Sequence, residues 1–173
     1  METISIARGG PADAGAIADL SRAAFDAAFA ADNTPENMKL FMEGPFSRER
    51  LMAEVHAGDS EYFIARKGDR LAGYATLRAG DTLPELAGVP ARELGRLYTD
   101  PEMKGLGIGS KLMQACIDRA VALGAGWLWL GVWEHNAAAF AFYRKWGFER
   151  FGSHIFELGT DPQTDWLMRR RLP

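Results

Sequence analysis

The segment from residue 93 to residue 133 constrains the fold more than any other part of this 173-residue chain. Its pattern predicts a strand (ELGRLYT), a glycine-rich loop (KGLGIGSK), a helix and a second strand (WLWLGVW). Two strands joined by a crossover helix pair in parallel, with the helix on one face of the sheet. The expected helix has apolar or small residues at helical spacing, at Leu112, Met113, Cys116, Ile117, Ala120 and Val121.

Elements on either side of this segment predict a mixed sheet. Alternating or apolar runs predict further strands at 3–8, 61–68, 70–78, 148–159 and 165–172. Helical spacing predicts helices at 11–29, 48–58 and 136–147, with room for one more helical turn at 36–42. The short hairpin links give antiparallel neighbours, so the order β-α-α-β-β-β-α-β-α-β-β indicates an α/β fold with a mixed sheet. No repeat or linker divides the chain, and we expect a single domain over 1–173.

Composition excludes several classes of protein. The chain has 20 Lys and Arg against 23 Asp and Glu, a net charge of -3, which gives no general attraction to nucleic acid or to an anionic membrane. A single cysteine, Cys116, excludes a disulfide framework, and His56, His135 and His154 are spaced too widely for a metal motif. The start lacks a signal-peptide pattern, and no 18-residue apolar run occurs. We therefore expect a cytoplasmic enzyme or binding module without metal, nucleic acid or membrane partners.

The glycine-rich loop does not match two familiar phosphate motifs. Ser110 stands at the position where the Walker A loop, which binds nucleoside triphosphates, needs a glycine. The same residue stands where the dinucleotide-binding fingerprint needs its third glycine. A protein-kinase loop lies between two strands, whereas this loop enters a helix. Glycines followed by a helix start still suit an anion, because the first N–H groups of a helix have no internal partner. The loop alone leaves two interpretations open, a pyrophosphate site and a plain turn.

A second group of residues lies on the helix predicted at 136–147. Asn136 and Tyr143 are seven residues apart, so they share one helical face with Ala139 and Phe140. Both can face a cleft, or Asn136 can serve as an N-cap and Tyr143 as a packing residue. A separate stripe, expected to face the core, contains Ala138, Phe142 and Trp146.

Together, KGLGIG at 104–109 and NAAAFAFYRKWGF at 136–148 resemble the GNAT superfamily of acetyl-CoA-dependent N-acetyltransferases. Lys104 stands where the loop pattern of that family has Gln or Arg, while Gly107 and Gly109 fit the pattern. Further stretches are similar to PaiA-type polyamine acetyltransferases: NTPENM, GRLY, WLGVWEHN, GSHIF and the DPQTD run. The resemblance covers nearly the whole chain and implies a GNAT fold in which the two central parallel strands splay apart.

The resemblance implies a binding site for acetyl-CoA, the co-substrate, between the splayed strands. Its pantetheine arm would run along Leu97, Tyr98 and Thr99, with Gly131 to Trp133 across the gap. A free N–H group at Leu97 or Tyr98 would hold the thioester carbonyl and then stabilise the oxyanion. The pyrophosphate would be held by the loop, through Lys104, Gly105, Leu106, Gly107, Ile108, Gly109 and Ser110.

The same resemblance implies direct transfer of the acetyl group from sulfur to a neutral amine. Tyr143 matches the residue that protonates the departing thiolate, and Asn136 would contact the cofactor or position the amine. Glu93, at the start of the splayed strand, is the expected general base, with a solvated strand-end charge as the alternative.

A polyamine such as spermidine or spermine is the predicted acceptor. Its distal ammonium groups would contact acidic residues in the N-terminal third, although a solvated helical face is equally consistent with them: Asp26, Asp32, Glu36 and Glu43. Met38 and Met42 either line the acceptor site or pack in the core. A peptide or protein N-acetyltransferase and a non-catalytic acetyl-CoA-binding module remain as alternatives. The sequence does not decide whether the protein forms a homodimer. It also does not decide whether the loop at 79–92 completes the cleft or a subunit interface.

Overall fold

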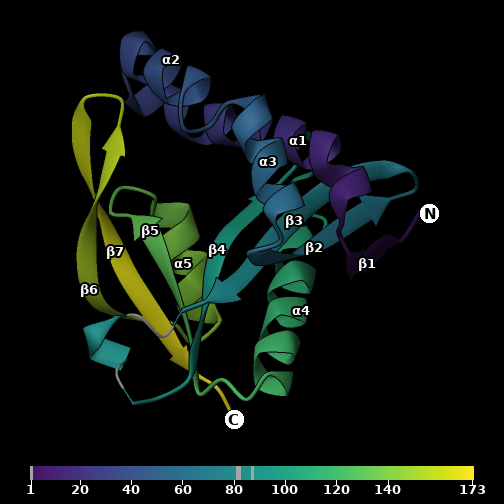
Figure 1. The fold of residues 1–173 in the computed structure, drawn as a ribbon, viewed down its shortest axis with the longest axis vertical. Helices are drawn as coiled ribbons and strands as arrows, with labels where there is room; N and C mark the ends of the chain where they lie inside the picture. The colour runs from purple at the N-terminus through teal and green to yellow at the C-terminus, as the bar shows by residue number, and fades with distance from the viewer. Residues whose placement is uncertain (1, 81–82, 87) are drawn as a thin grey trace.

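A computed structural model describes residues 2–80, 83–86 and 88–173 and contains one seven-stranded sheet in the order β1-β2-β3-β4-β5-β7-β6 (Figure 1). The strands are β1 (Ile4–Arg8), β2 (Ser60–Lys67), β3 (Arg70–Ala79), β4 (Ala91–Thr99), β5 (Trp127–Trp133), β6 (Glu149–Leu158) and β7 (Asp161–Arg171). The helices are α1 (Ala14–Phe29), α2 (Pro35–Glu43), α3 (Arg48–Ala57), α4 (Ile108–Ala122) and α5 (Ala137–Lys145). Only the pair β4–β5 is parallel, and the predicted mixed α/β fold is confirmed.

Three helices, not two, precede β2, so the predicted element order is wrong at this point. Thr34 is the N-cap of α2 and accepts a hydrogen bond from the Asn37 N–H group at 3.2 Å. Pro35 follows at the first helical position, where its missing N–H group costs nothing. These two signals extend the single turn expected at 36–42 into a nine-residue helix.

The core lies on both faces of the sheet, with α4 and α5 on one face and α1 and α3 on the other (Figure 1). Leu112, Met113 and Cys116 of α4 are fully buried against the sheet, as their spacing predicted. Two residues of the predicted stripes face solvent instead: Val121, which is 38% exposed, and Ala138. Each lies next to a buried or half-buried residue in the sequence. Because a helix rotates by about 100° per residue, the side chain of each points away from the sheet.

The central parallel strands separate after three residue pairs, which confirms the predicted splay. β4 pairs with β5 only from Ala91 to Glu93, and its remaining residues pair with β3 alone. A bulge at Gly95 marks the separation, because the β3–β4 register slips between Thr76 and Leu77. A Cβ atom at Gly95 would lie 2.7 Å from the Thr76 hydroxyl oxygen, so only glycine fits this bulge.

The hairpin of β6 and β7 extends toward α2 and is tied to it (Figure 1). Gly159, with a φ of 61°, and Thr160 form its two-residue turn. The Thr160 N–H group donates to Asn37 Oδ1 at 3.0 Å, and Gln163 Nε2 donates to Asn33 Oδ1 at 2.6 Å. β7 begins at Asp161, four residues before the start of the predicted strand. The hydrogen bonds to Asn33 and Asn37 close one end of the cleft that is described below.

Candidate active site

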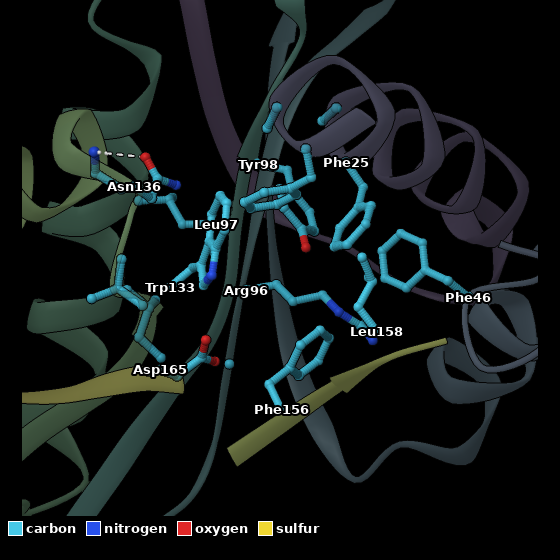
Figure 2. A pocket seen from close by; sticks show the side chains of 18 of the residues that line it. Phe25, Phe46, Arg96, Leu97, Tyr98, Trp133, Asn136, Phe156, Leu158 and Asp165 are labelled. Atoms are coloured by element: carbon cyan, nitrogen blue, oxygen red, sulfur yellow. Dashed lines mark hydrogen bonds between the residues drawn. The ribbon is translucent and has the colours of Figure 1, made fainter. Parts of the chain in front are cut away.

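A cleft of about 630 Å³ opens where β4 and β5 diverge (Figure 2). β4 and β5 form its floor, α5 borders one end, and α1 with the β6–β7 hairpin borders the other. Residues 105–110 of the predicted cofactor loop are not part of its lining. The structure brings these other predicted site residues to the cleft: Glu93, Leu97, Tyr98, Thr99, Lys104, Gly131, Val132, Trp133, Asn136, Tyr143 and His154.

The free edge of β4 presents specific backbone groups to the gap. The Asp100 N–H group donates to the Ala72 carbonyl of β3 at 2.8 Å. Successive residues of a strand direct their backbone N–H and carbonyl groups to opposite edges. Tyr98 lies two residues before Asp100, so its backbone groups also face β3. A Cβ atom added to Gly73 would lie 2.9 Å from the Tyr98 carbonyl oxygen, in agreement with that direction. Of the two N–H groups left open by the sequence, the one at Leu97 therefore faces the gap.

The glycine-rich loop leads into α4 with its backbone uncovered. Gly105 and Gly107 have φ values of 80° and 73°, a left-handed conformation that favours glycine, and an added Cβ atom would meet nothing within 4 Å. The first backbone hydrogen bond of α4 runs from the Lys111 N–H group to the Gly107 carbonyl at 3.1 Å. The three N–H groups before it, at residues 108–110, are thus available to an anion of pyrophosphate size.

Two side chains of the α5 region border the cleft. Asn136 caps α5, because its Oδ1 atom accepts from the Ala139 N–H group at 3.2 Å, and Figure 2 shows its amide nitrogen on the cleft side. It therefore combines the capping role with a place in the site. Burial raises the pKa of the Tyr143 hydroxyl above its usual value, so this group stays protonated and can donate a proton.

The half of the cleft farther from the glycine loop is aromatic, and sequence reasoning missed it. Phe25 of α1 lies 4.7 Å from Phe41 and 5.0 Å from Phe46 between ring centroids, and Phe156 of β6 lies 5.6 Å from Phe41. The Tyr98 hydroxyl points toward this half (Figure 2), and burial raises its pKa to about 12.

Two of the carboxylates that line the cleft are engaged by arginine. Both carboxylate oxygens of Glu93 accept from Arg78, at 2.7 and 2.8 Å, and the Glu93 side chain is 15% exposed. This geometry contradicts the alternative of a solvated strand-end charge, while the role of Glu93 as general base stays a prediction. Glu54 of α3 accepts from Arg96 at 2.6 Å, and the Arg96 guanidinium lies 5.2 Å from the Phe46 ring centroid.

The acidic residues predicted to hold a polyamine lie outside the cleft. Helical rotation places the acidic positions outward and the phenylalanines inward, so all four are solvent-exposed: Asp26, Asp32, Glu36 and Glu43. Met38 is buried among the phenylalanines, and Met42 packs against the same cluster, so both contribute to packing. The expectation of an acidic acceptor wall at these positions is therefore wrong.

His56 and His135 lie outside the lining of the cleft, whereas His154 belongs to it. Across residues 2–80, 83–86 and 88–173, no group of three His, Cys, Asp or Glu side chains lies close enough to hold a metal ion. Within the same ranges, no helix has the length and apolarity needed to cross a membrane. Part of the loop at 79–92, namely residues 81, 82 and 87, lies outside the described residues.

Comparisons with known proteins agree with this geometry. The profile of the acetyltransferase (GNAT) family matches residues 23–148. An uncharacterized N-acetyltransferase of Lactobacillus delbrueckii subsp. lactis is 33% identical over 153 residues, which cover 88% of each chain. An uncharacterized N-acetyltransferase of Mycobacterium tuberculosis is 31% identical over 160 residues, or 92% of this chain and 98% of the relative. The PaiA N-acetyltransferase of Thermoplasma acidophilum, solved in complex with coenzyme A, shares the fold with a TM-score of 0.78, at 21% identity over 98% of this chain and 99% of that one.

Proposed function

Because this chain belongs to the GNAT family and is an acetyl-CoA-dependent N-acetyltransferase, we propose that it acetylates a primary amine held in the aromatic half of the cleft. The observation that carries this proposal is that three features line one cleft: the unpaired edge of β4, Lys104 at the start of the glycine loop, and Tyr143.

The residues present fit acetyl-CoA, which supplies the acetyl group as an activated thioester. The N–H groups of residues 105–110 would bind the pyrophosphate at the N-terminus of α4, and Lys104 would add a point charge. The Leu97 and Thr99 backbone groups would bind the pantetheine arm along the free edge of β4. The Asn136 amide nitrogen, which its capping bond leaves free, would donate to an oxygen of the same arm.

Amide formation would proceed by direct attack of the neutral amine on the thioester carbon. A carbon–nitrogen bond forms, and the Leu97 N–H group stabilises the negative charge that develops on the carbonyl oxygen. The carbon–sulfur bond then breaks, and the Tyr143 hydroxyl protonates the departing thiolate. Tyr143 lies in the lining of the cleft at the end of the β4–β5 gap, on the side of the glycine loop.

The chemistry of the acceptor half favours a monoamine with an apolar body. Phenylalanine rings bind an apolar group by burial and a cationic group through their faces, and several line this half: Phe25, Phe29, Phe41, Phe46 and Phe156. A polyamine is the second candidate, because its distal ammonium groups would have to compete with Arg78 and Arg96 for Glu93 and Glu54. The ties between the β6–β7 turn and α2 close one end of the cleft and disfavour an extended peptide.

Release of free thiol from acetyl-CoA tests this proposal across a panel of amines. We expect the highest kcat/KM with an arylalkylamine such as 2-phenylethylamine, and lower values with spermidine, spermine and a peptide amine. Activity confined to spermidine and spermine would move the acceptor class to polyamines. Activity with the peptide alone would replace the small-molecule proposal, and no thiol release with any amine would support a non-catalytic binding module.

Cys116 will not disturb that assay. Its side chain is fully buried on α4, and burial raises the pKa of its thiol to about 12, so the reactive thiolate is scarce at pH 8. We expect an aromatic disulfide reagent to titrate no thiol in the native protein and one thiol after denaturation. Rapid reaction of the native protein would show that α4 opens readily from the sheet.

A further inference from the structure

Among the residues that the structure describes, three carboxylates line the cleft, and they differ in what holds them. Glu93 and Glu54 accept hydrogen bonds from Arg78 and Arg96, and a guanidinium cannot take up a proton. Asp165 contacts His154 instead, with 3.3 Å between Oδ2 and Nε2. An imidazole can accept a proton and release it near neutral pH. Asp165 therefore has the partner that a proton-accepting carboxylate needs.

Strand pairing places this dyad beside the gap in the sheet. Asp165 of β7 lies opposite His154 of β6 on one side and opposite Trp133 of β5 on the other. Gly131 of β5 leaves room for both, since an added Cβ atom would lie 3.3 Å from His154 Cε1 and 3.6 Å from Asp165 Oδ2. Figure 2 shows the Asp165 carboxylate directed into the cleft, toward the space between Trp133, Arg96 and Phe156.

Exposure divides the dyad into an inner and an outer group. The Asp165 side chain is 15% exposed, whereas the His154 side chain is 45% exposed. A proton taken up at Asp165 can thus pass to the imidazole and from there to water. Burial also raises the pKa of the Asp165 carboxyl, although nearby His154 opposes the shift, and a higher pKa makes its carboxylate a stronger base.

We propose that Asp165 accepts the proton of the bound ammonium and that His154 carries this proton to solvent. The inference rests on the amine acetylation proposed above and assigns its general base. The ammonium N–H bond breaks, the proton binds an Asp165 oxygen and then the neutral His154 ring, and the nitrogen lone pair becomes free to attack. The aromatic wall assists, because it disfavours the charged form of the amine. A second proton leaves the nitrogen as the amide forms and replaces the one that Tyr143 gives to the thiolate, so one proton in total is released to solvent.

Other titratable groups face this dyad and will shape the pH dependence. They come from every element around the cleft: Arg78 of β3, Glu93, Arg96 and Tyr98 of β4, Glu54 of α3, Tyr143 of α5, and Lys104 of the loop. The two glutamates are neutralised by their arginine partners, and Tyr98 lies close enough for Asp165 to raise its pKa further, after the larger effect of burial.

The test compares two amines that differ in basicity but hardly in shape. One is the best basic amine of the panel, expected to be 2-phenylethylamine, and the other is its β,β-difluoro analogue, which is largely neutral at the assay pH. Asp165→Asn is expected to lower kcat about 100-fold with the basic amine and less than about 10-fold with the fluorinated one. His154→Gln is expected to show the same selectivity with a smaller loss. Both amines are measured on one preparation, so a partly unfolded variant does not change their ratio.

Two control variants complete the experiment. Glu157→Gln changes an exposed carboxylate of the same hairpin outside the cleft, and its activity is expected to equal that of the wild type. Glu93→Gln is expected to affect both amines equally, since it breaks an ion pair without removing the base. Equal losses with both amines in Asp165→Asn would overturn the assignment, as would a basicity-dependent loss in Glu93→Gln. If the wild type acetylates no amine, the proposed function itself fails. If the wild type is active but the dyad is dispensable, only the assignment of the general base fails.

Discussion

Replacing Tyr143 with phenylalanine is expected to lower kcat about 100-fold, the lower end of the usual contribution of a general acid. The change removes one hydroxyl and leaves the ring, which packs against Phe142 and Phe148 at centroid distances of 5.5 and 5.9 Å. The departing thiolate then loses the hydroxyl that is proposed to protonate it. Affinity for acetyl-CoA is expected to remain within about fivefold of the wild type, because a net hydrogen bond contributes only about 1 kcal/mol. Steady-state kinetics and calorimetric titration measure the two quantities.

Tyr98→Phe is the matched control, because it makes the same chemical change in the same cleft. The Tyr98 hydroxyl lies on the acceptor side, so its loss is expected to raise KM for the amine more than it lowers kcat. Burial raises the pKa of both hydroxyls, so a difference between the two variants reflects position and not acidity. Unchanged turnover in Tyr143→Phe would remove it as the acid, and a large loss of kcat in Tyr98→Phe would transfer that role.

The parts of the fold that were predictable are those set by local patterns. Apolar spacing and the glycine loop between 93 and 133 sufficed for the parallel pair and for α4. The splay came from the family resemblance alone, because the bulge at Gly95 depends on contact with Thr76, nineteen positions earlier. The missed helix α2 had local signals in Thr34 and Pro35, which the neighbouring prolines obscured.

Within the site, backbone features were predictable and side-chain partnerships were not. The loop and α5 carry patterns of their own, but Glu93 and Arg78 meet only because β3 and β4 pair. The aromatic wall was hidden because phenylalanines at helical spacing are typical of a core. One partnership had a usable signal: a two-residue turn at 159–160 places His154 opposite Asp165 by counting along the hairpin.

Gly107→Ala is expected to weaken binding of acetyl-CoA about 10- to 100-fold. The φ of 73° at Gly107 is strained for alanine, so the substitution is expected to shift the backbone that presents the first N–H groups of α4. Loss of one or two hydrogen bonds to a charged phosphate, at about 1.5 to 3 kcal/mol in total, corresponds to that change in Kd. Calorimetric titration with acetyl-CoA measures it directly.

Gly124→Ala separates this loss of affinity from loss of stability. Gly124 lies just beyond the other end of α4, has a φ of 81°, and also has nothing within 4 Å of an added Cβ atom. Both variants are therefore expected to lower the free energy of unfolding by about 1 to 2 kcal/mol, as measured with urea. Only Gly107 adjoins the N-terminal N–H groups, so only its variant loses affinity for acetyl-CoA. Equal weakening in both variants would mean that general destabilisation is the cause, and wild-type affinity in Gly107→Ala would place the pyrophosphate away from this loop.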